Sequence, residues 1–104
     1  MKDKQNNLGI TILFSALNEE NLIELTVTEI LPVACETLNK FEIILINDGS
    51  KDKTGMIMDQ LASQYSEIQV VHHPKPGGLG NAFKVGLALS KFEKLVLSFL
   101  EIEP

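Results

Sequence analysis

Four apolar runs alternate with segments of helical spacing, and this alternation constrains the fold more than any other feature of the chain. The runs lie at residues 10–14, 41–46, 68–72 and 94–100. The first two are apolar on both faces, as strands buried between layers of helices are. A repeated order of strand, helix and strand is typical of a parallel sheet. We therefore predict an α/β fold, a parallel sheet with helices on both faces.

Three segments between these runs carry apolar residues on one helical face. The first begins at Glu19, and its apolar residues recur every three or four positions, at Ile23, Val27, Ile30, Ala34 and Leu38. We expect Asn18 to be the N-cap of this helix and Pro32 to kink or divide it. The other two helices are predicted at residues 54–65 and 79–89.

Polar segments follow all four predicted strands, at residues 15–20, 47–50, 73–80 and 101–103. The carboxyl ends of parallel strands meet at one edge of a sheet, where ligands of such folds bind. We therefore expect these four segments to form one ligand-binding edge.

Two carboxylates at this edge have alternative interpretations. Asp48 lies in the turn that Gly49 permits. Its carboxylate either accepts hydrogen bonds from a base or ribose, or makes an Asx turn onto the backbone near Ser50. Glu19 either contacts a ligand or serves only in the first turn of a helix.

Two further segments have the composition of binding loops. The run Gly77-Gly78-Leu79-Gly80 opens the third predicted helix, where free N–H groups suit a phosphate. It lacks the third glycine of the dinucleotide fingerprint and lies in the third strand-to-helix turn, whereas that fingerprint belongs to the first. Glu101 and Glu103 either share a divalent cation or belong to a solvated chain end.

Charge and hydropathy narrow the class of partner. The 104 residues include 14 acidic and 9 basic side chains, a net charge of −5, with no cluster of Lys or Arg. We therefore predict no binding to nucleic acid or to anionic lipid. No apolar run approaches the roughly 20 residues that cross a bilayer, and Cys35 has no second cysteine to pair with. We expect a cytoplasmic chain.

Three segments of the chain resemble the N-terminal half of the family 2 glycosyltransferases, which include the dolichyl-phosphate mannose and glucose synthases. The likeness covers roughly residues 10–100 and is carried by the segments ILFSALNEE, EIILINDGSKDKT and GGLGNAFKVGL. It implies a GT-A fold, whose Rossmann-like N-terminal half binds the nucleotide of a UDP- or GDP-linked sugar donor.

The resemblance also implies roles for individual residues. By position, Ala16, Asn18 and Glu19 would contact the nucleoside, Asp48 the base, and Gly78 would lie near the donor. The family's Asp-x-Asp motif binds ribose and a Mg²⁺ or Mn²⁺ ion on the diphosphate, and its place is taken here by Glu101-Ile102-Glu103. Ser15 stands where the family often has proline, and Asn47 where it usually has aspartate.

Family catalytic domains are longer than this chain, and their second half supplies the acceptor site and the aspartate that acts as general base. No residue here corresponds to either, so no catalytic residue is assigned and the chain's own enzymatic activity stays open. We expect residues 1–104 to be a single truncated nucleotide-sugar-binding domain. In the reaction that the resemblance implies for the complete domain, an inverting transferase transfers the sugar of the nucleotide donor to a lipid or saccharide acceptor.

Two other functions are compatible with the same architecture. One is a catalytically silent nucleotide-binding or assembly module. The other is a receiver-type signalling domain, which needs an aspartate after the third strand, where this chain has His73-Pro74. The apolar fourth strand also predicts a homo-oligomer, a dimer joined through that strand and the helix at residues 79–89. A longer parent with membrane segments would place the domain at the cytoplasmic face of a membrane.

Overall fold

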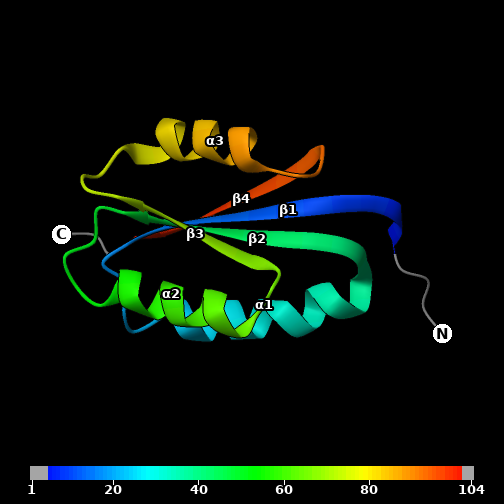
Figure 1. Ribbon diagram of the computed structural model, residues 1–104, viewed down its shortest axis with the longest axis horizontal. Coiled ribbons are helices and arrows are strands. Elements are labelled where there is room, and N and C mark those ends of the chain that lie inside the picture. Colours follow the sequence, from blue (N-terminus) through cyan, green and yellow to red (C-terminus); the bar gives the residue numbers. More distant parts are fainter. Residues whose placement is uncertain (1–4, 102–104) are drawn as a thin grey trace.

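The structure is a computed structural model, which describes the backbone of residues 5–101 and the side chains of residues 9–96. Strands and helices alternate strictly along this part of the chain (Figure 1). The elements are β1 (Gln5–Leu17), α1 (Ile23–Thr37), β2 (Leu38–Asp48), α2 (Thr54–Gln64), β3 (Ile68–His73), α3 (Gly78–Leu89) and β4 (Lys94–Glu101).

The four strands form one parallel sheet in the order β3-β2-β1-β4. Helices α1 and α2 lie side by side on one face, and α3 covers the other (Figure 1). The sheet therefore has helices on both faces, and the predicted α/β fold is confirmed.

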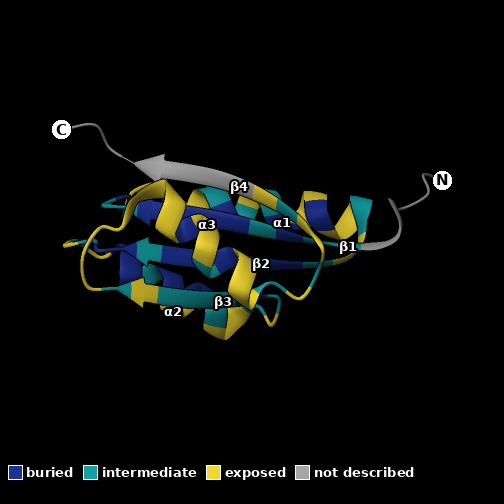
Figure 2. Cartoon of the chain, turned by 90° about the horizontal axis from the view of Figure 1, so that it is seen from above, coloured by how far each residue is buried: buried dark blue, intermediate teal, exposed yellow. Residues whose placement is uncertain are grey.

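Two apolar clusters hold these layers together. Successive residues of a strand point to opposite faces, so Phe14 packs beneath α1 and α2 while Leu13 packs beneath α3. β2 supplies both clusters, and its residues 43–46 have no exposed surface. The deepest burial lies along the two central strands (Figure 2). On the α3 side, a Cβ on Gly86 would lie 2.5 Å from Cδ2 of Leu13, so the close approach of helix and sheet requires glycine.

Three expectations about the first helix are wrong: its start at Glu19, its N-cap at Asn18 and its extension to Leu38. α1 begins at Ile23, four residues after the predicted start, so Glu19 does not belong to its first turn. Asn18 is not its N-cap, because the Asn18 side chain accepts a hydrogen bond from the backbone of Lys51 instead. Leu38 begins β2 rather than ending the helix, and Pro32 lies inside α1 without dividing it.

Within the described residues, no helix is both long enough and apolar enough to cross a membrane.

Candidate functional site

The carboxyl ends of all four strands lie at one edge of the sheet, as the sequence predicts. Strand pairing places Leu17 beside Glu101, and Asp48 beside His73. All three strand pairings are parallel, so the four strands run in the same direction. We call this edge, with the loops that follow the strands, the carboxyl edge.

Asp48 ends β2 at this edge and is 1% exposed. Its carboxylate accepts hydrogen bonds from the backbone N–H groups of Gly77 (2.8 Å) and Gly78 (3.3 Å), and Nδ1 of His73 lies 3.6 Å away. Asp48 thus ties the end of β2 to the start of α3. The alternative of an Asx turn at Asp48 is wrong, because Asn47 makes that turn by accepting the N–H of Ser50 at 3.0 Å.

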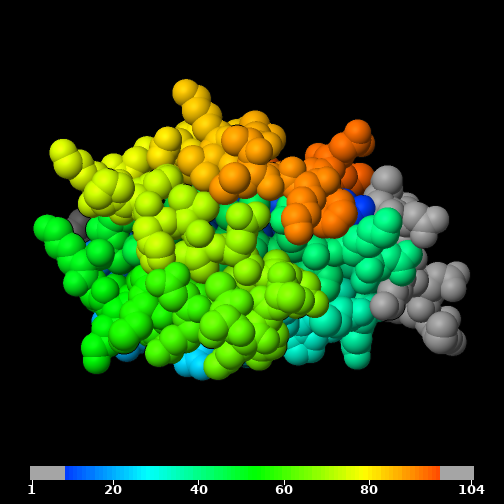
Figure 3. Space-filling view, in the orientation of Figure 1, coloured from blue at the N-terminus to red at the C-terminus, as the bar shows by residue number. Residues whose placement is uncertain are grey.

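Two glycines at the carboxyl edge adopt left-handed backbone conformations. Gly49 has φ +81°, and a Cβ there would lie 2.5 Å from the backbone nitrogen of Pro76, so the turn after β2 touches the loop before α3. The space-filling view shows these green and yellow segments in contact (Figure 3). Gly78 has φ +79°, and a Cβ there would have no neighbour within 4 Å. The expectation that its N–H is free for a phosphate is wrong, because this N–H donates to Asp48 Oδ2 at 3.3 Å.

A set of reciprocal hydrogen bonds joins the loop after β1 to the loop after β2, and we call it the loop clasp. Backbone N–H groups of the first loop donate to side chains of the second: Asn18 to Ser50 Oγ, Glu19 to Thr54 Oγ1 and Glu20 to Asp52 Oδ2, at 3.0, 2.8 and 3.2 Å. In return, the N–H of Lys51 donates to Asn18 Oδ1 at 2.8 Å, and that of Lys53 to Glu20 Oε1 at 2.9 Å.

Asn18 turns the chain into this clasp. Its φ of 56° lies in the left-handed region, which asparagine tolerates better than most residues. Residues 18–20, the segment Asn-Glu-Glu, therefore form a loop and do not begin the helix.

Asp52 is the acceptor that organises the second loop. Burial raises the pKa of its carboxyl, but hydrogen bonds from the Thr54 hydroxyl and from the backbone N–H groups of Thr54 and Glu20 outweigh this effect and lower the pKa below 3.8. From the sequence alone, Asp52 or Ser50 is predicted only to cap the helix that begins near Thr54. The signal for a wider role is its spacing from Thr54, since an Asp two residues before a Thr at a helix start can bind both its N–H and its hydroxyl.

Glu19 is 4% exposed, yet no described residue donates a hydrogen bond to its carboxylate. Its main chain is fixed, because its N–H is bound by Thr54 and its carbonyl accepts the N–H groups of Leu22 and Ile23. Among the described residues, the fully buried side-chain atom without a partner is Ser15 Oγ, so the Glu19 oxygens keep contact with solvent and can accept a hydrogen bond from a ligand. Ala16 has no exposed surface, its side chain belongs to the core, and strand pairing places it between Asn47 and Leu100.

The expected metal ligands lie at the end of the described chain. The backbone of Glu101 ends β4 beside Leu17, at the carboxyl edge, and Glu103 lies outside the described residues. Within the described part of the chain, no group of three or more His, Cys, Asp and Glu side chains is arranged to hold a metal ion.

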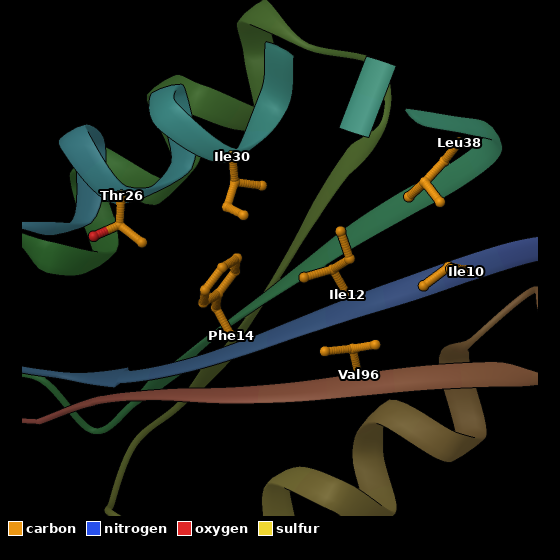
Figure 4. Close-up of a pocket in the computed structure, with 7 residues that line it drawn as sticks. All are labelled: Ile10, Ile12, Phe14, Thr26, Ile30, Leu38 and Val96. Atoms are coloured by element: carbon orange, nitrogen blue, oxygen red, sulfur yellow. The ribbon is translucent and has the colours of Figure 1, made fainter. Parts of the chain in front are cut away.

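An apolar hollow of about 470 Å³ lies between α1 and the sheet. In Figure 4, side chains of α1 and of three strands point into it; its lining residues are Ile10, Ile12, Phe14, Thr26, Ile30, Leu38 and Val96. None of the residues that line the hollow is ionisable. A charged ligand would therefore find its binding partners at the carboxyl edge and not in the hollow.

Comparisons with known proteins agree with this geometry. Residues 11–100 match the family described as glycosyl transferase family 2. EpsJ of Bacillus subtilis (strain 168), an uncharacterized glycosyltransferase, is 33% identical over 82 residues, which are 79% of this chain and 23% of that protein. The dolichyl-phosphate beta-glucosyltransferase ALG5C of Trichomonas vaginalis is 37% identical over 57 residues, 55% of this chain and 17% of that protein. The chain thus spans less than a quarter of either relative.

A solved structure has the same fold. It is the mannosyltransferase PcManGT from Pyrobaculum calidifontis in complex with GDP-Man and Mn²⁺, with a TM-score of 0.75 and 20% sequence identity. The match covers 86% of this chain and 26% of that one. It confirms the predicted Rossmann-like architecture of a GT-A fold.

Proposed function

Because the chain belongs to glycosyl transferase family 2, we propose that it is the part of an inverting glycosyltransferase that binds the nucleotide-sugar donor. The donor is UDP- or GDP-linked, and the sugar passes to a lipid or saccharide acceptor. A cytoplasmic location, or the cytoplasmic face of a membrane, belongs to the same proposal.

The observation that carries the proposal is the Glu19 carboxylate. Glu19 as a whole is 4% exposed, and its carboxylate receives no hydrogen bond from a described residue. The hydroxyl groups of a ribose and the N–H groups of a base are donors that satisfy such an acceptor. We assign nucleoside contacts to Glu19, to Asn18 beside it and to the backbone of Ala16.

Asp48 and Gly78 complete the proposed nucleotide site. The Asp48 carboxylate accepts two N–H groups, and its two oxygens have lone pairs for a further donor, so a contact to the base is compatible with its present partners. Open space at the Gly78 Cα leaves room for the donor to approach the backbone. The N–H groups of Gly77 and Gly78 therefore hold the Asp48 carboxylate in place at the side of the proposed nucleotide site.

Glu101 and Glu103 are the proposed ligands of a Mg²⁺ or Mn²⁺ ion on the diphosphate. Carboxylate oxygens are the donors these ions prefer, so the residue types fit, and the backbone of Glu101 ends at the carboxyl edge. The bound ion would stabilise the negative charge of the departing nucleoside diphosphate. This chain's own residues hold and orient the donor, while no described residue is assigned to activate the acceptor hydroxyl.

The second candidate is a catalytically silent nucleotide-binding or assembly module. Acceptor-dependent release of nucleoside diphosphate separates the two functions, since a silent module binds the donor without transfer.

Self-association is a further proposal. α3 carries an exposed apolar stripe at Leu79, Phe83 and Leu87, which are 52%, 43% and 55% exposed. β4 is an edge strand of the sheet. Apolar surface of this kind beside the edge strand of the described sheet favours a dimer.

Isothermal titration with GDP and with UDP, each with and without Mn²⁺, tests the nucleotide-binding proposal. Glu19→Gln keeps the size of the side chain but removes its charge, and we expect affinity to fall about tenfold. Glu36→Gln, on the exposed surface of α1, is the matched control and should bind as the unchanged chain does. Equal affinity of all three chains would remove Glu19 from the site.

A further inference from the structure

We propose that Thr54 and Asp52 are positioning residues, which fix the loop after β1 in the conformation that binds nucleotide without touching the ligand themselves. This inference rests on the proposed nucleotide binding. It concerns the loop clasp, which joins residues 18–20 to residues 50–54.

The hydroxyl of Thr54 is fully used inside the protein. Thr54 has no exposed surface. Its Oγ1 accepts the N–H of Glu19 at 2.8 Å and donates its one proton to Asp52 Oδ1 at 2.5 Å. A buried hydroxyl bound on both sides is not available to a ligand, so its effect on binding passes through Glu19.

Asp52 anchors the same loop one residue further along. Its Oδ1 accepts the N–H of Thr54 at 2.9 Å as well as the Thr54 hydroxyl, and its Oδ2 accepts the N–H of Glu20 at 3.2 Å. A single side chain thus joins the first turn of α2 to the loop before α1. Loss of Thr54 releases the N–H of Glu19, and loss of Asp52 releases the N–H of Glu20.

These bonds hold the main chain of Glu19 in place, while its carboxylate has no hydrogen-bond partner among the described residues. Its N–H is held by Thr54 and its carbonyl by the N–H groups that start α1. A loop that is already ordered loses less conformational entropy when a ligand binds, which increases affinity. The clasp therefore acts on affinity by holding the Glu19 carboxylate in place before the nucleotide arrives.

The clasp lies apart from both apolar clusters, since none of its residues belongs to either. We therefore expect its loss to affect nucleotide affinity beyond any effect on thermal stability. A control must separate these two effects, and β1 offers one. Thr11 is also fully buried and also donates to a carboxylate, Glu42 Oε2 at 2.7 Å, but it lies six residues before the end of β1.

The experiment compares the unchanged chain with Thr54→Val, which removes the hydroxyl at nearly constant volume, and Thr54→Ser, which restores it. Thr11→Val is the control for the loss of a buried threonine hydroxyl. Each chain is titrated with GDP and with UDP, melted thermally, and examined by NMR for amide hydrogen exchange at Glu19 and Glu20.

We expect Thr54→Val to bind about tenfold more weakly and to exchange faster at Glu19, with Thr54→Ser within about threefold of the unchanged chain. Thr11→Val should lower the melting temperature and leave affinity within about threefold. Unchanged affinity in Thr54→Val, or an equal loss in Thr11→Val at equal loss of stability, would overturn the positioning role. Failure of the unchanged chain to bind either nucleotide would overturn the proposed function and the positioning role with it, whereas unchanged exchange at Glu19 contradicts the clasp alone.

Discussion

The backbone N–H of Glu19 donates to the hydroxyl of Thr54 at 2.8 Å, across 35 positions of the sequence. This bond joins the segment Asn-Glu-Glu after β1 to the segment Asn-Asp-Gly-Ser-Lys-Asp-Lys-Thr, which runs from the end of β2 to the start of α2. Many of the polar groups in these segments therefore form hydrogen bonds between the two loops. The carboxylate of Glu19 is left as an acceptor for a ligand.

Replacing each of two glycines in α3 with alanine should change the free energy of unfolding in opposite directions. Gly78 has φ +79°, so Gly78→Ala should destabilise the fold by about 1–2 kcal/mol through backbone strain, without a clash. Gly80 lies within α3 and has equally open space, so Gly80→Ala should stabilise by about 0.5–1 kcal/mol. Chemical denaturation measures both. Shifts of the same sign in the two variants would contradict the left-handed assignment at Gly78.

Ser15 carries a buried side-chain oxygen with no hydrogen-bond partner among the described residues, and the residue has no exposed surface. Ser15→Ala removes that unsatisfied group and keeps the backbone of β1. We expect the free energy of unfolding to rise by about 1 kcal/mol. Thr11→Ala is the contrasting change, because Thr11 does have a partner in Glu42, and it should destabilise. A Ser15→Ala chain less stable than the parent would show that the hydroxyl is bonded in solution.

The lowered pKa of Asp52 gives stability a defined pH dependence. A carboxyl whose folded pKa is below its unfolded value stabilises the fold above the unfolded pKa, and this contribution is lost as the pH falls through the folded value. Unfolding free energies of the parent and of Asp52→Asn should therefore differ by a constant amount near neutral pH. The difference should shrink as the pH falls below 3.8. A difference that grows toward acid pH would contradict the lowered pKa.

Self-association through α3 and β4 predicts a concentration-dependent mass. Light scattering should detect dimers at micromolar concentration, and Phe83→Lys together with Leu87→Lys should return the chain to a monomer, because both side chains are exposed in the single copy. The melting temperature of the parent should rise with concentration. A parent chain that is monomeric, with one melting temperature across a hundredfold dilution, would rule this dimer out.

The sequence predicted the fold well because its signals are local and repeated. Apolar runs such as residues 41–46 specify a buried strand wherever they occur, and each is followed by a polar segment. The loops after β1 and β2 were less predictable, since the side chain of Asn18 could bind the helix that follows it or a distant loop. Only the folded chain brings Lys51 to Asn18 and so decides between them. Likewise, the pairing of Asp48 with Gly77 depends on how α3 returns to the sheet.

The central claim is that the carboxyl edge binds a nucleotide, and residue-resolved NMR during titration with GDP and with UDP tests it most directly. The account predicts saturable shifts of the backbone amides of Ala16, Asn18, Glu19, Asp48 and Gly78. Amides at the opposite end of the sheet, such as those of Thr11 and Glu42, should stay in place. Saturable shifts centred on Thr11 and Glu42, or no shifts with either nucleotide, would contradict the claim.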